Sequence, residues 1–273
     1  MKKYWILFHD GALLVQREEN GWSLPCTENA PLPVEGLCHE IGEWKGIPCV
    51  AMKLAGEVLL ETLPNNDPEL NLTPVVLPPV SQALVGLRNS HGYLPLKGYR
   101  LAERAAGLLF WDENTQYCGV CGTKNELDTA ISKHCPSCGK LQFPSINPAI
   151  LAMVRRDDKI LLVHARNFSR DFHSLVAGFL ESGETFEECV AREIREETTL
   201  EVTNIRYFGS QEWPYPSGIM VGFICDYVSG EICFADQELT SGDFYGPIDL
   251  PLLPQKLSLA RIMIDAWLAG DIN

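Results

Sequence analysis

Two pairs of cysteines constrain the fold of this 273-residue chain more than any other feature. Each pair has the spacing C-x2-C, and thirteen residues separate the two pairs. Four thiolates spaced in this way can converge on one ion, and closed sites made of four cysteines usually hold zinc. We therefore predict a zinc ribbon over residues 115–143, with a structural Zn²⁺ that has no open position for substrate. Its ligands are Cys118, Cys121, Cys135 and Cys138. The alternative is that these are four unrelated cysteines or a redox pair.

Composition and charge exclude several classes of protein. Apolar residues make up 46% of the chain and charged residues 21%, which is ordinary for a globular protein and excludes a disordered one. The net charge of −14 disfavours general binding to nucleic acids or to anionic membranes, but it allows a local nucleotide site that brings its own cations. No stretch approaches the roughly 18 apolar residues of a membrane span. His9 interrupts the apolar N-terminal run and no signal cleavage site follows, so we expect a cytoplasmic protein with no membrane association.

Local patterns predict an α+β chain. Short apolar runs between turn signals predict strands, two of them joined by an Asp10-Gly11 hairpin turn: 4–8, 12–16, 47–54, 146–154, 159–165, 204–210, 219–228 and 231–235. Helical periodicity predicts helices at residues 81–88, 101–111, 185–199 and 257–268. We expect an N-terminal α+β domain over residues 1–114 with a proline-rich linker at 64–80, then the ribbon, and then a C-terminal domain over 144–273. The lack of regular strand–helix–strand alternation favours the α+β class.

The segment 178–200 is rich in glutamate and predicts the chemistry. Thr185 and Glu188 form a capping box, which marks the start of a helix. Its apolar stripe consists of Phe186, Cys189, Val190 and Ile194. Three carboxylates share one face of this helix: Glu193, Glu196 and Glu197. Like charges at such spacings oppose each other by about 0.2–0.5 kcal/mol per pair. The cluster is chemically reasonable if divalent cations bind among the carboxylates; the alternative is a solvated face balanced by Arg192 and Arg195.

The same segment matches the Nudix box, G-x5-E-x7-R-E-U-x-E-E-x-G-U, where U is aliphatic. The matching residues are Gly178, Glu184, Arg192, Glu193, Ile194, Glu196, Glu197 and Leu200. One position departs, because Thr199 stands where a glycine normally supplies a left-handed helix end. The chain resembles a Nudix hydrolase, which implies the Nudix fold, a mixed sheet in an α/β/α sandwich.

Two further segments resemble the NADH pyrophosphatase (NudC-type) family of Nudix hydrolases. Residues 210–220, SQEWPYPSGIM, are similar to that family's S-Q-P-W-P-F-P-x-S motif, with Glu212, Tyr215 and Gly218 as substitutions. Residues 258–261, SLAR, are similar to its S-I-A-R segment. Cys26 stands where family members tend to carry a lysine. The resemblance covers residues 80–273 well and the first 80 loosely.

The resemblance implies an activity and its metals. The family hydrolyses the pyrophosphate of NADH or NAD⁺ to nicotinamide mononucleotide and AMP, and removes NAD caps from RNA 5′ ends. Catalytic Mg²⁺ or Mn²⁺ would bind to Glu193 and Glu197, with Glu196, the carbonyl of Ala177 and Glu238. Either Glu196 or Glu197 would orient or deprotonate the attacking water.

The resemblance also implies a substrate site and a homodimer. Phe143 and Phe179 would stack on a base, although core packing is the common role of a phenylalanine. The full substrate-binding set is Arg88, Phe143, Phe179, Gln211, Glu212, Trp213, Pro214, Tyr215, Pro216, Ser217, Gly218 and Ala260. Two alternatives remain open: hydrolysis of another nucleoside diphosphate derivative such as ADP-ribose, and a non-catalytic Nudix nucleotide sensor.

Overall fold

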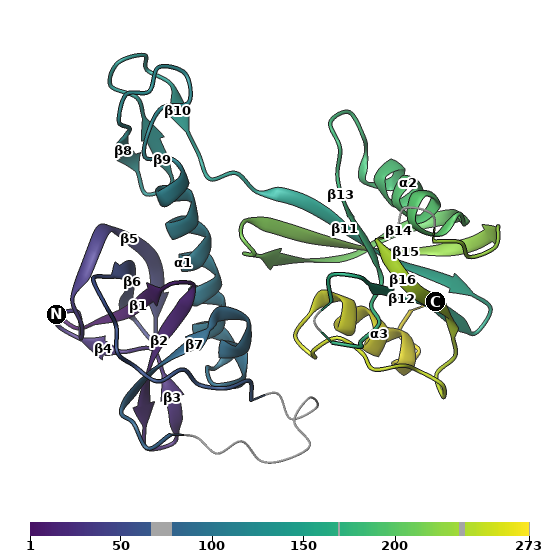
Figure 1. The fold of residues 1–273 in the computed structure, drawn as a ribbon, viewed down its shortest axis with the longest axis horizontal. Coiled ribbons are helices and arrows are strands. Elements are labelled where there is room, and N and C mark those ends of the chain that lie inside the picture. Colours follow the sequence, from purple (N-terminus) through teal and green to yellow (C-terminus); the bar gives the residue numbers. More distant parts are fainter. Residues whose placement is uncertain (67–77, 169, 235–237, 273) are drawn as a thin grey trace. The chain divides into compact units, whose positions relative to one another are not determined.

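A computed structural model describes residues 1–66, 78–168, 170–234 and 238–272 (Figure 1). Its contacts divide the chain into two compact units. Unit 1 comprises Met1–Ser145 with Pro214–Ser217, and unit 2 comprises Ile146–Trp213 with Gly218–Asn273. Most of the predicted linker, residues 67–77, lies outside the described residues. None of the described helices is long and apolar enough to cross a membrane.

Unit 1 is built around a seven-stranded sheet with the order β3-β2-β1-β6-β5, in which β4 pairs with β1 and β7 with β2. The strands are β1 (Lys3–His9), β2 (Ala12–Glu18), β3 (Gly21–Ser23), β4 (Cys26–Thr27), β5 (Val34–Trp44), β6 (Ile47–Leu54) and β7 (Gln82–Gly86). The predicted Asp10-Gly11 hairpin is confirmed: both residues have positive φ, and His9 pairs with Ala12. Such a turn matches the twist of the strands that it joins.

Helix α1 (Leu96–Asn114) packs on this sheet and follows a short 3₁₀ helix, η1 (Leu87–Gly92). Leu101, Ala105 and Leu108 of α1 are buried in the same core cluster as Ile6 and Val15 of the sheet. The 3.6-residue period of a helix places these three α1 positions on one face. The helix predicted at 101–111 is therefore confirmed, with longer bounds than the sequence pattern gave.

The helix predicted at residues 81–88 is wrong. Residues 82–86 form β7, whose backbone pairs with β2, with Leu84 opposite Leu14. Ala83, Leu84 and Val85 are all buried. A strand covered on both faces has a continuous apolar run instead of an alternating one, and such a run cannot be told from a helix by periodicity.

Three short strands form the cysteine-rich ribbon, β8 (Glu126–Thr129), β9 (Ser132–His134) and β10 (Leu141–Gln142), at one end of α1 (Figure 1). The buried Lys133 of β9 holds this ribbon on the helix. Its Nζ lies 2.5 Å from Oδ1 of Asp112 and donates to the Asp112 carbonyl at 2.8 Å. His39 of β5 lies on the other side of the Asp112 carboxylate, with 3.5 Å between Nε2 and Oδ2.

Unit 2 is a six-stranded mixed sheet with the order β14-β15-β11-β12-β16, in which β13 pairs with β11. Its elements are β11 (Asn147–Arg156), β12 (Lys159–Ala165), β13 (Val176–Phe179), α2 (Phe186–Thr198), β14 (Glu201–Trp213), β15 (Gly218–Ser229), β16 (Leu239–Tyr245) and α3 (Leu259–Ala269). β11 and β15 run parallel, whereas the other pairs are antiparallel. The strands and helices predicted at 146–154, 159–165, 204–210, 219–228, 185–199 and 257–268 are confirmed within a few residues.

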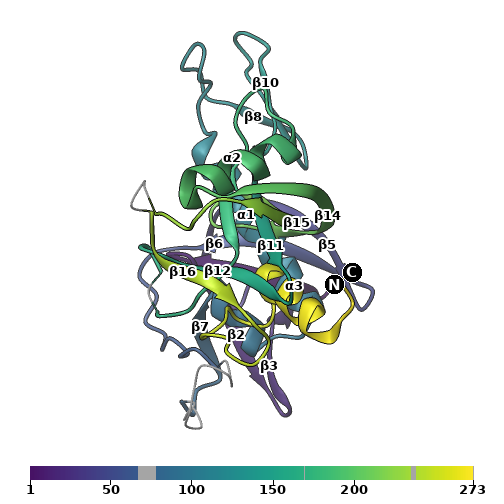
Figure 2. The same cartoon turned by 90° about the vertical axis from the view of Figure 1, so that its right-hand side faces the viewer.

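The two helices of unit 2 cover opposite faces of its sheet, as both views show (Figures 1 and 2). Ile150 and Ala152 of β11 are buried with Ile194 of α2. Leu151, the strand residue between them, is buried with Met263 of α3 instead. Because successive side chains of a strand point to opposite faces, this alternation builds an α/β/α sandwich. The predicted α+β class and the mixed-sheet sandwich are confirmed.

The strand predicted at 231–235 is wrong over its described residues, 231–234. Their backbone satisfies the end of α2 instead of extending the sheet. The Cys233 amide donates to the Thr198 carbonyl at 3.1 Å, and the Thr199 hydroxyl donates to the Glu231 carbonyl at 2.6 Å. The last carbonyls of a helix have no partner within it, so this segment caps the helix. Thr199 takes the left-handed conformation with φ 62°, the role that glycine has in the Nudix box.

Candidate active site

The glutamate helix begins at the predicted capping box. The Thr185 hydroxyl accepts from the Glu188 amide at 3.2 Å, and the Glu188 carboxylate accepts from the Thr185 amide at 2.8 Å. Both bonds satisfy amides that the first helical turn leaves unpaired. Cys189, Val190 and Ile194 are fully buried against the sheet. Glu193 follows Cys189 by four residues and Glu197 follows Ile194 by three, so these two carboxylates lie beside the stripe, on the side of α2 that faces the sheet.

Arg192 holds the carboxylates around this helix in position. Its guanidinium binds both oxygens of Glu184, at 2.5 and 3.0 Å, and donates to Glu193 at 2.9 Å and to Glu196 at 3.0 Å. It also donates to the carbonyl of Phe179 at 3.0 Å, which links α2 to the end of β13. The Arg192 hydrogen bonds lower the pKa of Glu184 to about 2, and Glu184 in turn raises the pKa of Arg192. Both groups are therefore charged at neutral pH, and the arginine fixes the positions of the carboxylates around it.

Gly178 of β13 lies directly under Glu193. A Cβ at position 178 would lie 1.8 Å from the Glu193 Cδ and 2.1 and 2.2 Å from its two oxygens. The carboxylate thus occupies the space that any side chain at position 178 would fill. Glycine leaves this space to the carboxylate. The close approach favours glycine here, and not the backbone conformation, because the φ of Gly178 is not in the left-handed region.

Glu193 is held in an environment that opposes its charge. Burial raises its pKa; the Arg192 guanidinium lowers it, and the negative charges of Glu196 and Glu238 raise it again. Glu238, just before β16, is one of the negative charges that oppose ionisation of Glu193. A cation among these carboxylates would relieve their mutual repulsion.

The remaining predicted metal ligands differ in exposure. Glu197 is buried, whereas the side chain of Glu196 is 57% exposed. Ala177 precedes Gly178 in β13 and pairs with Leu151. Glu193, Glu196 and Glu197, all within the described residues, do not bring three oxygens within 4.8 Å of one another. The donor set, made of carboxylate and carbonyl oxygens, fits a hard divalent cation.

The four predicted zinc ligands lie together in unit 1. Their sulfurs are all within 4.8 Å of one another, with 3.6 Å between Cys118 and Cys138 and 3.4 Å between Cys121 and Cys135. Each pair sits on a tight turn closed by a glycine of positive φ, Gly122 or Gly139. The Val120 amide donates to the Cys118 sulfur at 3.4 Å and lowers the pKa of that thiol, which favours the thiolate that zinc requires. The cluster fits a structural Zn²⁺.

Six of the predicted substrate-binding residues lie in unit 2: Phe179, Gln211, Glu212, Trp213, Gly218 and Ala260. Phe179 is 66% exposed, which is unusual for a phenylalanine that serves only to pack a core. The side-chain amide of Gln211 instead bonds the backbone at the start of α3, donating to the Leu257 carbonyl and accepting from the Leu259 amide. Ala260 is only 4% exposed and packs in the core under α3, on the sheet face opposite α2.

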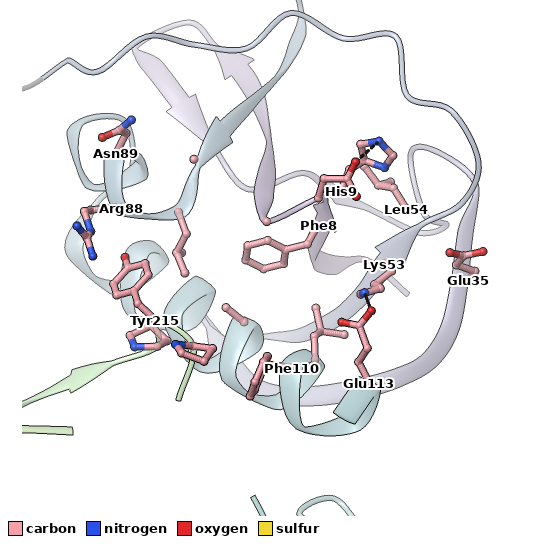
Figure 3. A pocket seen from close by; sticks show the side chains of 18 of the residues that line it. Phe8, His9, Glu35, Lys53, Leu54, Arg88, Asn89, Phe110, Glu113 and Tyr215 are labelled. Carbon is pink, nitrogen blue, oxygen red and sulfur yellow. Dashed lines mark hydrogen bonds and ion pairs between the residues drawn. The ribbon is translucent and has the colours of Figure 1, made fainter. Parts of the chain in front are cut away.

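The other six lie in unit 1: Arg88, Phe143, Pro214, Tyr215, Pro216 and Ser217. Phe143 is 54% exposed. Arg88 and Tyr215 line a cavity of about 770 Å³, with 4.5 Å between the guanidinium carbon and the ring centroid (Figure 3). This volume is that of a small-molecule site.

Sequence reasoning missed most of the lining of this cavity. Figure 3 shows Phe8 and Phe110 beside it and the Lys53–Glu113 ion pair on the side away from Arg88. These residues come from β1, β6 and α1, and they share no spacing that a sequence pattern could detect. The sequence identified Arg192 as a residue of the Nudix box, but it did not show that this arginine holds the carboxylates in place.

The sandwich, with Arg192 and a row of carboxylates beside a glycine-bearing strand, defines the class of the protein as a Nudix hydrolase. Three family models match the chain: a NUDIX domain at residues 146–264, an NADH pyrophosphatase zinc ribbon domain at 113–143, and an NADH pyrophosphatase-like rudimentary NUDIX domain at 2–111.

The match to curated relatives extends over almost the whole chain in one case and over its larger part in another. The chain is 33% identical over 270 residues to the NAD-capped RNA hydrolase NudC of Pseudomonas aeruginosa, which covers 97% of this chain and 89% of the relative. It is 41% identical over 172 residues to the protein of the same name from Photobacterium profundum, which covers 63% of this chain and 65% of that one. The chain belongs to the NADH pyrophosphatase (NudC-type) family of Nudix hydrolases.

Proposed function

We propose that this enzyme hydrolyses the pyrophosphate bond of NADH and NAD⁺, giving nicotinamide mononucleotide and AMP, and removes NAD caps from RNA 5′ ends. The observation that carries the proposed reaction is the Glu193 carboxylate seated on the backbone of Gly178 beside Arg192 and Glu196. The choice of substrate is supported by the relatives named as NAD-capped RNA hydrolases and by the ribbon and rudimentary domains of NADH pyrophosphatase type.

Mg²⁺ or Mn²⁺ would be held by Glu193 and Glu197, with Glu196, Glu238 and the carbonyl of Ala177. A divalent ion bound there supplies neutralisation of the two phosphates and a water of lowered pKa. The chain's own residues then act as positioners and proton acceptors. Arg192 holds Glu193 and Glu196 in place, and Glu196 or Glu197 accepts the proton of the attacking water. Because the carboxylates are placed before substrate arrives, little reorganisation is needed during the reaction.

The exposed rings of Phe179 and Phe143 are proposed to stack on the bases of the substrate, a contact of about 1–3 kcal/mol per base. Arg88 is proposed to bind a phosphate. The loop and hairpin residues from Gln211 to Gly218 shape the site, and Ala260 contributes through its backbone. We further propose a cytoplasmic homodimer with domains at residues 1–114, 115–143 and 144–273.

The test is release of AMP from NADH by the purified full chain in the presence of Mg²⁺ or Mn²⁺. Glu197→Gln removes one proposed ligand without changing size and should abolish turnover. The matched control is Glu187→Gln, an exposed residue in the first turn of the same helix, which should retain wild-type turnover. Full activity of the Glu197 variant would refute its role.

The substrate is tested by comparing NADH, NAD⁺, ADP-ribose and NAD-capped RNA at equal concentrations. We expect the highest kcat/KM with NADH or with the NAD cap. A strong preference for ADP-ribose would overturn the proposed substrate. Binding of these dinucleotides without cleavage of any of them would favour the nucleotide sensor instead.

A further inference from the structure

A second group of metal-ligating side chains lies in unit 2, in addition to the four cysteines of unit 1. It consists of His164 at the end of β12 and of Asp171 and His173 in the connection between β12 and β13. Each offers one ligand atom, and the three atoms lie within 4.8 Å of one another. Nothing in the Nudix box or in the ribbon accounts for this group.

Each of the two histidines uses one ring nitrogen to fix its orientation. Nδ1 of His164 lies 2.8 Å from the Phe172 carbonyl, to which it can only donate, so Nε2 of His164 carries the lone pair. Nε2 of His173 lies 3.3 Å from the Ser241 hydroxyl. Nδ1 of His173 is buried and has no hydrogen-bond partner among the described residues. A backbone carbonyl or hydroxyl on one nitrogen, with the other left for the metal, is the usual arrangement of histidine ligands.

The charges in this group also favour a cation. The two imidazole rings are 5.5 Å apart, so simultaneous protonation would place two positive charges close together. The exposed Asp171 supplies a carboxylate oxygen next to the two histidine rings. A cation bound there would be held by two nitrogen donors and one oxygen donor, a set that suits a divalent metal ion.

The group lies on the face of the sheet opposite α2 and its three glutamates. Leu161 and Val163 of β12 are buried on the α2 side of the sheet, and Ile160 and Leu162 on the α3 side. Because strand side chains alternate between faces, His164 lies on the α3 side. Tyr245 of β16, also packed on the α3 side, is in edge contact with the ring of His173.

We propose that His164, Asp171 and His173 bind a further divalent transition metal ion, with zinc as the preferred occupant. Two imidazoles and one carboxylate suit zinc, which takes nitrogen at about 2.0–2.1 Å and leaves a fourth position for water. Tetrahedral ligands at that length lie about 3.3 Å apart, so a small inward movement from the present spacing completes the site. The ion would join the end of β12 to the chain segment that leads into β13, the strand that carries Ala177 and Gly178.

The experiment is a Zn²⁺ titration of the full chain with its ribbon already loaded and Mg²⁺ in excess to occupy the carboxylate site. Calorimetry should show one further Zn²⁺ per chain. Imidazole nitrogen NMR should show shifts at Nε2 of His164 and Nδ1 of His173. His164→Gln and His173→Gln should each lose this binding, and Ser241→Ala should weaken it about 10- to 100-fold by releasing the second nitrogen of His173.

His91→Gln, a histidine of unit 1, is the matched control and should bind as the wild type does. Circular dichroism of each variant checks that it is folded, and Ser241→Ala keeps the test valid if a histidine variant is not. Absence of further Zn²⁺ binding by the wild type would overturn the proposal. Undiminished binding by folded His164 and His173 variants would overturn it equally.

Discussion

Replacement of Gly178 by alanine should separate activity from stability. The new Cβ would lie 1.8 Å from the Glu193 Cδ. Non-bonded carbon atoms in contact lie about 3.5 Å apart, so the carboxylate must withdraw by about 1.7 Å. It is the far end of a flexible side chain, so it can move away without a change in the backbone. Its 2.9 Å bond to Arg192 would be disrupted by the movement.

The size of the effect follows from that displacement. Misplacement of a catalytic group by about 1 Å can cost 100-fold in rate, so we expect kcat for NADH to fall by at least about 100-fold. That loss corresponds to about 2.7 kcal/mol of transition-state stabilisation. The free energy of unfolding should change by less than about 1 kcal/mol, because alanine restricts the unfolded chain and position 178 has no positive φ.

The assay pairs AMP release with urea unfolding of the same preparation. Gly209→Ala is the matched control: it lies in β14 of the same sheet, and its Cβ would meet nothing closer than a methyl of Leu259 at 3.9 Å. This control should keep wild-type kcat. If Gly178→Ala retained kcat within twofold while folded, Glu193 would not need its present position and the reasoning would be refuted.

Three further predictions concern the metal ribbon, a buried ion pair and acid stability. Cys135→Ser should abolish retention of zinc, measured by elemental mass spectrometry, and lower the melting temperature, because binding of structural zinc contributes directly to folding; retained zinc would contradict the four-ligand site. Lys133→Met leaves the Asp112 carboxylate without its cation, so urea unfolding should show a loss of about 3–5 kcal/mol; a loss under 1 kcal/mol would contradict this role. The Arg192 guanidinium depresses the pKa of Glu184 in the folded state to about 2, against about 4.3 unfolded, so its stabilisation is complete above pH 4.3 and is lost as pH falls through 2. The stability difference between the wild type and Glu184→Gln, measured by urea unfolding from pH 5 to 2, should shrink as pH falls; a constant difference would show that this pair is not responsible.

The errors in sequence reasoning came from segments whose conformation depends on distant partners. β7 looked helical because it is buried on both faces, and that burial comes from tertiary packing around β2 and α1. Residues 231–234 looked like a strand, but their backbone groups bond the end of α2 instead. Local rules gave better results where the cause was itself local, as in the Asp10-Gly11 turn and the Thr185 cap.

The sequence by itself determined the zinc-binding cysteine spacing, the start and buried stripe of the glutamate helix, the α+β class and the family. These features depend on patterns along the chain, in which the spacing of residue types indicates the local geometry. Only the tertiary structure decided that Glu193 rests on Gly178, that Arg88 and Tyr215 share a cavity, and that His164 meets His173 beside Ser241. These close approaches depend on how the sheets and helices pack against one another. Packing is the sum of many weak contacts between residues that are far apart in the sequence, and no spacing pattern identifies those residues in advance.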